Sequence, residues 1–337
     1  MSSQPIDQLG RPVRDLRLSV TDRCNFRCIY CMPRDAFGPN HAFLARTEIL
    51  TYEEFARLVS VFAQLGVSKV RLTGGEPLLR KDLETLVSMV AATPGITDVA
   101  LTTNGSLLAD RAGSLCAAGL DRVTVSLDSI DPAMFAAMAD TRLSLTTVLD
   151  GIAAAAVAGL TPIKLNAVVR RGRNDDGILE LAEFARAHGH VLRFIEYMDV
   201  GDTNKWVLDD VVPSAEVIAR INAVFPVEPM SAGQRGEVAK RWRYVDGSGE
   251  IGVISSVTQP FCTDCTRARV TSTGELFTCL FGSGKLDLRA MMREGASDDE
   301  LRQTISRVWS GRRDRYSEVL RGSGNHEPRA EMSYLGG

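Results

Sequence analysis

The chain of 337 residues has few histidines, no large excess of charge and no long apolar run. The four histidines are His41, His188, His190 and His326. So small a number argues against a His-rich zinc enzyme and against catalysis by several imidazoles. The formal net charge of −3 argues against a protein whose whole surface binds nucleic acid, although it allows a local basic site. Hydrophobic residues make up 45% and charged residues 24%, which excludes wholesale disorder.

The most apolar stretch, residues 151–160, is Ala-rich and too short to cross a bilayer. The first twenty residues contain no apolar run typical of a secretory signal. We therefore expect a soluble, cytoplasmic protein without a membrane partner. In a reducing compartment, the seven cysteines are better explained as metal or cluster ligands than as disulfides.

Short β-rich runs alternate with helical patterns up to about residue 196. The β-rich runs cover residues 16–20, 69–73, 98–103, 122–127, 163–169 and 191–196. Helical patterns follow the Thr51–Glu54 capping box and cover residues 81–92, 146–158 and 176–188. This alternation predicts an α/β protein with a parallel sheet. Six units are two short of a closed barrel, so we expect an open six-fold (βα) partial TIM barrel, with a doubly wound sheet as the alternative.

The pattern changes after residue 196. Residues 214–225 predict one more helix, and residues 238–257 and 269–280 each predict a hairpin. We expect a smaller α+β region that covers the opening of the barrel. The predicted divisions are a barrel over residues 1–196, a C-terminal domain over 197–320 and a flexible tail over 321–337.

The predicted strands are apolar on one face and polar on the other. The polar face carries Arg17, Lys69, Arg71, Lys164 and Arg193. The interior of a filled barrel would be branched aliphatic side chains, so this polar face predicts a cavity. Concentrated cations in an acidic chain predict an anionic ligand, although any single one could lie at an exposed strand end.

Six of the seven cysteines form two sets of three: Cys24, Cys28 and Cys31, and Cys262, Cys265 and Cys279. A [4Fe–4S] cluster normally takes four cysteines, so three would leave one iron open to a small molecule. The alternative for either set is a zinc site with a fourth ligand. Cys116 is left over in an Ala- and Leu-rich helical context and is expected to be a buried small hydrophobe.

The first cysteine set, with Tyr30 before its last cysteine and Gly74-Gly75-Glu76-Pro77 after the second strand, resembles the radical S-adenosylmethionine (SAM) superfamily. The second set, the run Arg267-Ala268-Arg269 and the final Gly336-Gly337 resemble one family within it, the GTP 3′,8-cyclases of molybdenum cofactor biosynthesis. The resemblance runs nearly end to end.

The resemblance implies a role for each matching residue. Cys24, Cys28 and Cys31 would hold a [4Fe–4S] cluster that binds SAM, and Cys262, Cys265 and Cys279 a second [4Fe–4S] cluster. The implied SAM contacts are Tyr30, Gly75, Ser126 and Met198. The implied GTP contacts are Arg17, Arg71, Thr102, Lys164, Arg267, Ala268 and Arg269. Arg17, Gly336 and Gly337 are the implied catalytic residues, the last two at the tip of a tail that reaches the barrel.

The resemblance also implies the reaction. A 5′-deoxyadenosyl radical removes hydrogen from ribose C3′ of GTP, and C3′ then attacks guanine C8 to give 3′,8-cyclo-7,8-dihydro-GTP. A reducing electron donor, transfer of the product to cyclic pyranopterin monophosphate synthase, and a monomer or homodimer are further expectations. The alternatives are a radical SAM peptide-modifying enzyme with an auxiliary cluster, and a non-enzymatic Zn- or Fe–S-binding protein.

Overall fold

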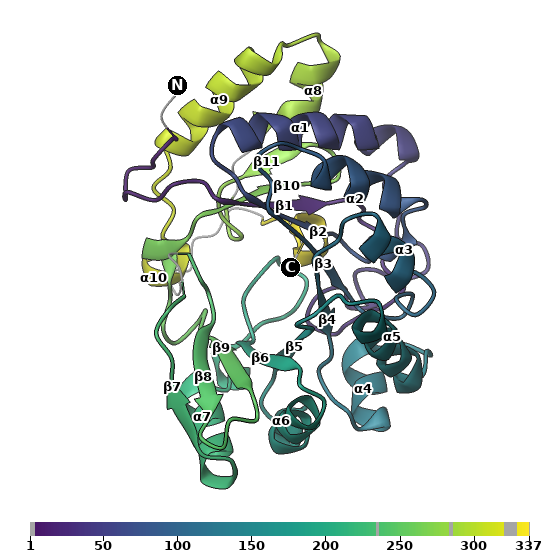
Figure 1. Ribbon diagram of the computed structural model, residues 1–337, viewed down its shortest axis with the longest axis vertical. Coiled ribbons are helices and arrows are strands. Elements are labelled where there is room, and N and C mark those ends of the chain that lie inside the picture. Colours follow the sequence, from purple (N-terminus) through teal and green to yellow (C-terminus); the bar gives the residue numbers. More distant parts are fainter. Residues whose placement is uncertain (1–3, 234–235, 283–285, 320–328, 337) are drawn as a thin grey trace.

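The computed structural model describes residues 4–233, 236–282, 286–319 and 329–336. Its strands curve around a central space, and helices cover their outer face (Figure 1). The first six strands are β1 (Asp15–Ser19), β2 (Lys69–Thr73), β3 (Asp98–Thr103), β4 (Arg122–Ser126), β5 (Lys164–Val169) and β6 (Val191–Glu196). The helices among and after them are α1 (Tyr52–Gln64), α2 (Leu83–Ala91), α3 (Ala112–Ala117), α4 (Pro132–Ala139), α5 (Leu145–Val157), α6 (Ile178–Ala187) and α7 (Ser214–Val224).

The six strands pair in chain order and in parallel, as expected for a partial barrel. The predicted capping box at α1 is confirmed: Thr51 Oγ1 accepts from Glu54 N–H, and the Glu54 carboxylate accepts from Thr51 N–H. The helix α3 lies in the helical context expected around Cys116. The helix α4 was not predicted, because it is short and its apolar residues give weak helical periodicity.

The C-terminal strands extend the barrel sheet at both edges. They are β7 (Val227–Pro229), β8 (Lys240–Tyr244), β9 (Glu250–Ile254), β10 (Arg267–Val270), β11 (Glu275–Phe277) and β12 (Leu286–Asp287). The antiparallel pairs β8–β9 and β10–β11 confirm the two predicted hairpins. In addition, β9 pairs in parallel with β6 and β10 with β1, which gives one sheet of twelve strands across the described residues.

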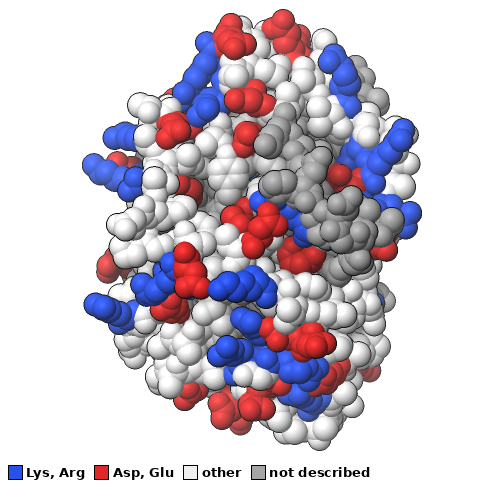
Figure 2. Space-filling model, turned by 180° about the vertical axis from the view of Figure 1, so that it is seen from behind, with Lys and Arg blue, Asp and Glu red and all other residues white. Residues whose placement is uncertain are grey.

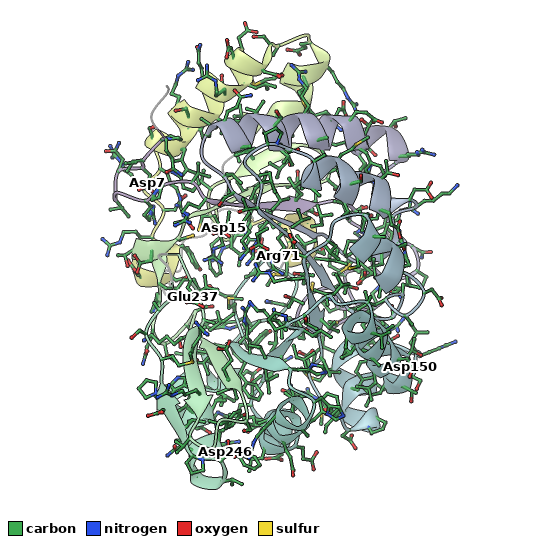
Figure 3. The ribbon with its side chains drawn as sticks, viewed as in Figure 1. Asp7, Asp15, Arg71, Asp150, Glu237 and Asp246 are labelled. Carbon is green, nitrogen blue, oxygen red and sulfur yellow. The ribbon has the colours of Figure 1, made fainter. Side chains whose placement is uncertain are left out.

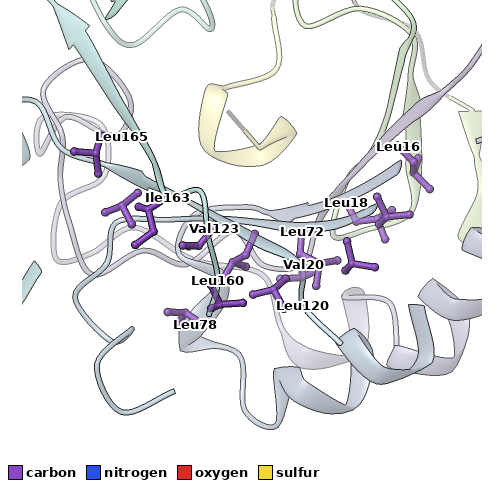
Figure 4. Packing of buried hydrophobic residues seen from close by; sticks show 14 of the residues in the cluster. Leu16, Leu18, Val20, Leu72, Leu78, Leu120, Val123, Leu160, Ile163 and Leu165 are labelled. Carbon is purple, nitrogen blue, oxygen red and sulfur yellow. The ribbon is translucent and has the colours of Figure 1, made fainter. Parts of the chain in front are cut away.

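The remaining helices are α8 (Leu288–Arg293), α9 (Asp298–Ser310), α10 (Tyr316–Val319) and α11 (Met332–Leu335). The apolar strand residues form the core on the outer side of the strands; in Figure 4, Leu16, Leu18 and Leu72 lie on the helix side. The short helix α11 lies on the opposite, concave side (Figure 4). The polar strand face therefore lines the interior, as the sequence pattern predicts.

Basic and acidic side chains are interspersed over the face shown in Figure 2, without one broad area of a single sign. Among the described residues, no helix is both long and apolar enough to span a membrane.

Candidate active site

The loop after β1 carries Cys24, Cys28 and Cys31, which are all partly buried. Cys31 N–H donates to the Cys28 carbonyl at 3.0 Å, and Phe26 N–H donates to Cys24 Sγ at 3.4 Å. Burial raises the pKa of the Cys24 thiol to about 11. Burial, Asp128 and the neighbouring thiols raise the pKa of Cys28. Because adjacent thiolates disfavour one another without a compensating cation, this set fits an iron–sulfur cluster as its occupant.

The turn after β2 packs directly on this cysteine loop. Gly75 N–H donates to the Thr21 carbonyl at 2.8 Å. A Cβ on Gly74, whose φ is +141°, would lie 2.4 Å from Thr21 O, and one on Gly75 would lie 2.3 Å from Arg23 O. Both positions therefore require glycine. The two glycines let this turn pack closely against the backbone of the cysteine loop. The motif alone does not reveal this packing role.

Glu76 joins the same turn to the end of β3. Its buried carboxylate accepts from Leu78 N–H at 3.0 Å, from the Thr103 hydroxyl at 2.8 Å and from Asn104 N–H at 2.7 Å. Burial raises the pKa of Glu76 to about 7, against these hydrogen bonds, which lower it. Asn104 Nδ2 in turn donates to Asn25 Oδ1 at 2.8 Å. Asn104 was not among the predicted site residues; its one signal in the sequence is its place directly after a predicted strand.

A second hydrogen-bond chain starts at Tyr30. Its hydroxyl donates to Asp128 Oδ2 at 2.8 Å, and Asp128 Oδ1 accepts from Val168 N–H at 2.8 Å. Asn174 Nδ2 donates to the backbone carbonyls of Asp128 and Val168. Burial raises the pKa of Asp128 to about 6. The cysteine loop is thereby attached to the ends of β4 and β5.

The second cysteine set lies where β10 begins and β11 ends. Cys262 is in the 3₁₀ helix Cys262–Asp264, and Cys265 N–H donates to its carbonyl at 3.2 Å. Cys265 Sγ accepts from Arg267 Nη2 at 3.5 Å, and Cys279 Sγ accepts from Phe281 N–H at 3.5 Å. Burial alone would raise the pKa of the Cys265 thiol, but Arg267 and Arg312 outweigh it and lower the pKa to about 6.

One cavity of about 260 Å³ brings the two sets together. It is lined by all six cysteines and by most of the other predicted site residues: Arg17, Tyr30, Arg71, Gly75, Thr102, Ser126, Met198, Arg267 and Arg269. Cys116 lies elsewhere, on α3, where it is half-buried against the core. Within the described ranges, no three Cys, His, Asp or Glu side chains are arranged to hold a single metal ion.

A second cavity, of about 400 Å³, lies against the N-terminal ends of the barrel strands. Its cations are Arg17, Lys69, Arg71, Arg122, Lys164, Arg193, Arg241 and Arg267, of which Arg17, Arg71, Arg193 and Arg267 also line the first cavity. Figure 3 shows Arg71 inside the ring of strands, with Asp15 and Glu237 near the edge of the central space. The strand register places Arg17 between Arg71 and Arg269 on neighbouring strands.

Only some of the cations in these cavities form ion pairs with carboxylates. Arg122 and Lys69 pair with Asp98, and Arg241 pairs with Glu250. Among the described residues, Arg71 Nη1 donates only to the Thr102 and Thr124 hydroxyls, at 2.9 and 3.0 Å. In the described part of the chain, Arg17, Lys164 and Arg193 have no ion pair.

Burial and surrounding arginines lower the pKa values of these groups. The pKa of Lys164 falls to about 7 because of burial and of Arg193, Arg122 and other nearby cations. Burial and the neighbouring Arg269, Arg267 and Arg71 lower the pKa of Arg17. Such crowding is unfavourable without an anion, so the site fits a polyanionic ligand.

Two predicted residues lie differently from the rest. Ala268 is fully buried in the core on the outer side of β10, so only its backbone faces a neighbouring strand. Gly336 is buried on the concave side, where its carbonyl accepts from Arg269 Nη1. Gly337 and residues 320–328 of the predicted tail lie outside the described residues.

The described end of the tail is held at several points. Tyr334 hydroxyl donates to Glu275 Oε2 at 2.6 Å, and Leu335 is fully buried. Glu331 Oε2 accepts from the Thr203 hydroxyl at 2.8 Å. Thr203 lies shortly after Met198 in the sequence. Met332 lines the cavity that contains both cysteine sets.

The partial barrel and its cysteine loop define a class of protein. Residues 18–185 match the model of the Radical SAM superfamily, and residues 190–318 match that of Molybdenum Cofactor Synthesis C. A GTP 3′,8-cyclase of Acidothermus cellulolyticus is 55% identical over 99% of this chain and 100% of its own length. Those of Xanthomonas axonopodis pv. citri and Staphylococcus aureus are 48% and 43% identical, with 100% of both chains covered. This chain belongs to the GTP 3′,8-cyclase family within the radical SAM superfamily.

Solved structures show the same fold at low identity. Streptococcus suis SuiB bound to the precursor peptide SuiA has a TM-score of 0.60 and 14% identity, covering 94% of this chain and 68% of that one. SuiB bound to S-adenosylmethionine has a TM-score of 0.58 and 14% identity, covering 92% and 68%. These similarities confirm the partial barrel. At this low sequence identity they are evidence for the fold and for nothing else.

Proposed function

We propose that this protein converts GTP to 3′,8-cyclo-7,8-dihydro-GTP, the first step of molybdenum cofactor biosynthesis. The observation that carries this proposal is that two cavities share part of their lining. One is lined by two sets of three cysteines, the other by cations that carboxylates compensate only in part, and four arginines belong to both. A site of this kind can hold a polyanionic nucleotide against a radical source. The sequence similarity to GTP 3′,8-cyclases, which extends over the full length of the chain, supports the same conclusion.

The radical SAM part of the site consists of the first cysteine set and the strand ends around it. We assign Cys24, Cys28 and Cys31 to a [4Fe–4S] cluster, and Tyr30, Gly75, Ser126 and Met198 to SAM. When bound, the cluster and SAM supply a 5′-deoxyadenosyl radical for hydrogen removal from ribose C3′. The chain contributes position: Glu76, Asn104 and Asp128 fix the cysteine loop to the ends of β2, β3, β4 and β5.

We assign the cation-lined cavity to the triphosphate of GTP. Arg and Lys form charge-assisted hydrogen bonds with phosphate oxygens, and Arg17, Arg71 and Lys164 form no ion pair with the described residues. Arg267 and Arg269 then lie between the triphosphate and the second cysteine set. We propose that Cys262, Cys265 and Cys279 would hold a second [4Fe–4S] cluster, in which three thiolates would leave one iron available to the guanine of GTP. Thr102 contacts GTP beside Arg71, and Ala268 contacts it through its backbone alone.

The Gly336–Gly337 end is proposed to complete the site. In its described part, the Gly336 carbonyl accepts from Arg269 and Met332 lines the cavity of the cysteine sets, which supports a role for this end beside the nucleotide. A narrowed site holds C3′ and C8 in reactive geometry and excludes water. The proposal also includes a reducing electron donor, transfer of the product to cyclic pyranopterin monophosphate synthase, and a monomeric or homodimeric state.

The alternative from the sequence is a radical SAM peptide-modifying enzyme with an auxiliary cluster. The unpaired arginines and Lys164 favour a polyanion over a peptide. Anaerobic turnover of the reconstituted protein with GTP and SAM, followed by mass spectrometry, tests the choice. We expect 5′-deoxyadenosine and a cyclised nucleotide in matching amounts; SAM cleavage that GTP neither stimulates nor couples to a nucleotide product would overturn the proposal.

A further inference from the structure

Two buried arginines beside the second cysteine set have no place in the proposed GTP site. Arg11 comes from the segment before β1 and is fully buried, while Arg312 follows α9 and is 4% exposed. Both line the cavity that contains the six cysteines. The following inference rests on the proposed second cluster.

Arg11 is attached to the backbone of the ligating loop. Its Nη1 donates to the Cys262 carbonyl at 2.5 Å and to the Asp314 carbonyl at 3.0 Å. Its Nε donates to Asp7 Oδ2 at 2.6 Å, and its own carbonyl accepts from Trp309 Nε1. Nη2 is buried and has no hydrogen-bond partner among the described residues. An unpaired buried guanidinium N–H is costly, so Nη2 needs an acceptor.

Arg312 holds the next turn of the same loop. Its Nη1 donates to the Cys265 carbonyl at 2.7 Å, and its Nε lies 3.2 Å from Asp314 Oδ2. Its guanidinium also stacks on Trp309, 4.6 Å from the ring centroid. Asp7 accepts from both arginines, so the two guanidiniums form one connected unit.

The two cysteine sets have different electrostatic surroundings. Near the first set lie Glu76, Asp128 and Glu331, with Arg27 as the cation. Near the second set lie Arg11, Arg267 and Arg312 as cations, and Asp7, Asp314 and Glu318 as anions. The second set therefore has the more cationic environment. A positive environment and N–H donors to sulfur stabilise the reduced form of an iron–sulfur cluster.

We propose that Arg11 and Arg312 are positioning residues for the second cluster: they fix the Cys262–Cys265 loop, and Arg11 Nη2 donates to a sulfur of the cluster, which raises its reduction potential. Loss of either guanidinium makes that cluster harder to reduce. The first cluster, which these residues do not contact, keeps its potential.

The test isolates the second cluster by replacing Cys24, Cys28 and Cys31 with alanine in the full chain. This background is expected to bind about four irons after anaerobic reconstitution. Into this background we introduce R11K and R312K, which keep the positive charge but lose the planar set of guanidinium N–H donors. We also introduce R312Q, which removes the charge. The matched control is R313Q, because Arg313 is the adjacent, exposed arginine. An EPR-monitored redox titration measures the midpoint potential, and ENDOR in D₂O detects exchangeable protons coupled to the cluster.

We expect a more negative midpoint in all three test variants, with the largest shift in R312Q if it retains iron, and no shift in R313Q. R11K is expected to lose one exchangeable proton coupling. Unchanged potentials and couplings in iron-loaded R11K and R312K would overturn the inference while leaving the second cluster in place. A background that binds no iron at all would overturn the assignment of the second cluster instead.

Discussion

The carbonyl of Gly336 accepts a hydrogen bond from Nη1 of Arg269, so the last described residue of the chain is attached directly to a cation of the proposed GTP site. A Cβ at Gly336, whose φ is +71°, would lie 2.2 Å from Cγ2 of Thr73 on β2. The position therefore accepts no side chain unless α11 or β2 moves. We expect Gly336→Ala, or deletion of Gly336 and Gly337, to abolish cyclisation while both clusters and most SAM binding survive. Product analysis and SAM binding measured on the same preparation check this.

Two controls separate crowding from backbone strain. Gly159 also has a positive φ, of +86°, but open space around it, so Gly159→Ala is expected to retain activity. Thr73→Ser removes the methyl group that a new Cβ would meet, so G336A/T73S is expected to recover part of the activity. A synthetic peptide of the last residues added to the deletion variant is expected to restore some turnover. Full activity of the deletion would refute a role for the tail.

Truncation of the uncompensated arginines is expected to weaken GTP binding. Arg17→Ala and Arg71→Ala each remove a charge-assisted hydrogen bond, worth about 1.5–3 kcal/mol, which is roughly a ten-fold or larger loss of affinity. SAM binding should change little. Isothermal titration with GTP measures the effect, and Arg142→Ala, at an exposed arginine outside both cavities, is the control. Equal GTP affinity in R17A, R71A and R142A would place the substrate elsewhere.

The sequence predicted those arginines but not Arg11 and Arg312 beside the second cysteine set. Arg17 and Arg71 alternate with apolar residues on parallel strands, and a period of two assigns each to a face. Arg11 follows no such pattern, and its contacts at Cys262 and Asp314 are about 250 and 300 residues away. Likewise β9 and β10 were predicted only within hairpins. Their parallel pairing with β6 and β1 depends on tertiary packing, since no crossover helix directly precedes either strand.

Replacement of a cysteine in the first set and in the second set is expected to abolish different activities. Cys24→Ala should remove SAM cleavage, because it removes a ligand of the cluster that binds SAM. Cys262→Ala should leave uncoupled SAM cleavage and stop GTP conversion. Iron content, 5′-deoxyadenosine and the nucleotide product are measured on the same preparation. Cys116→Ala is the control and should keep about eight irons per chain. Loss of a cluster in C116A, or colourless protein with one zinc per set, would contradict the assignments.

The 2.8 Å hydrogen bond between Tyr30 and Asp128 gives a prediction for SAM binding. Tyr30→Phe removes the donor and leaves Asp128 attached to Val168 N–H. We expect a several-fold higher KM for SAM, because the cysteine loop is less well fixed, with iron content unchanged. Tyr52→Phe, which removes a hydroxyl bound to the Lys81 carbonyl, is the control. An unchanged KM in Y30F would show that the backbone alone positions the loop.

Binding of GTP is expected to depend on pH through Lys164. Its pKa of about 7 in the free protein results from burial and neighbouring cations, so between pH 7 and pH 9 the amine becomes mostly neutral. A bound triphosphate favours the charged amine and raises its pKa, so binding in this range takes up a proton. GTP affinity should therefore fall as pH rises from 7 to 9, and the binding enthalpy at pH 8 should vary with the ionisation enthalpy of the buffer. Lys164→Met should bind GTP more weakly and lose most of this dependence, except for the share from Lys69, whose pKa is also lowered by burial and Arg71. The same proton uptake in wild type and K164M would assign the titration to another group.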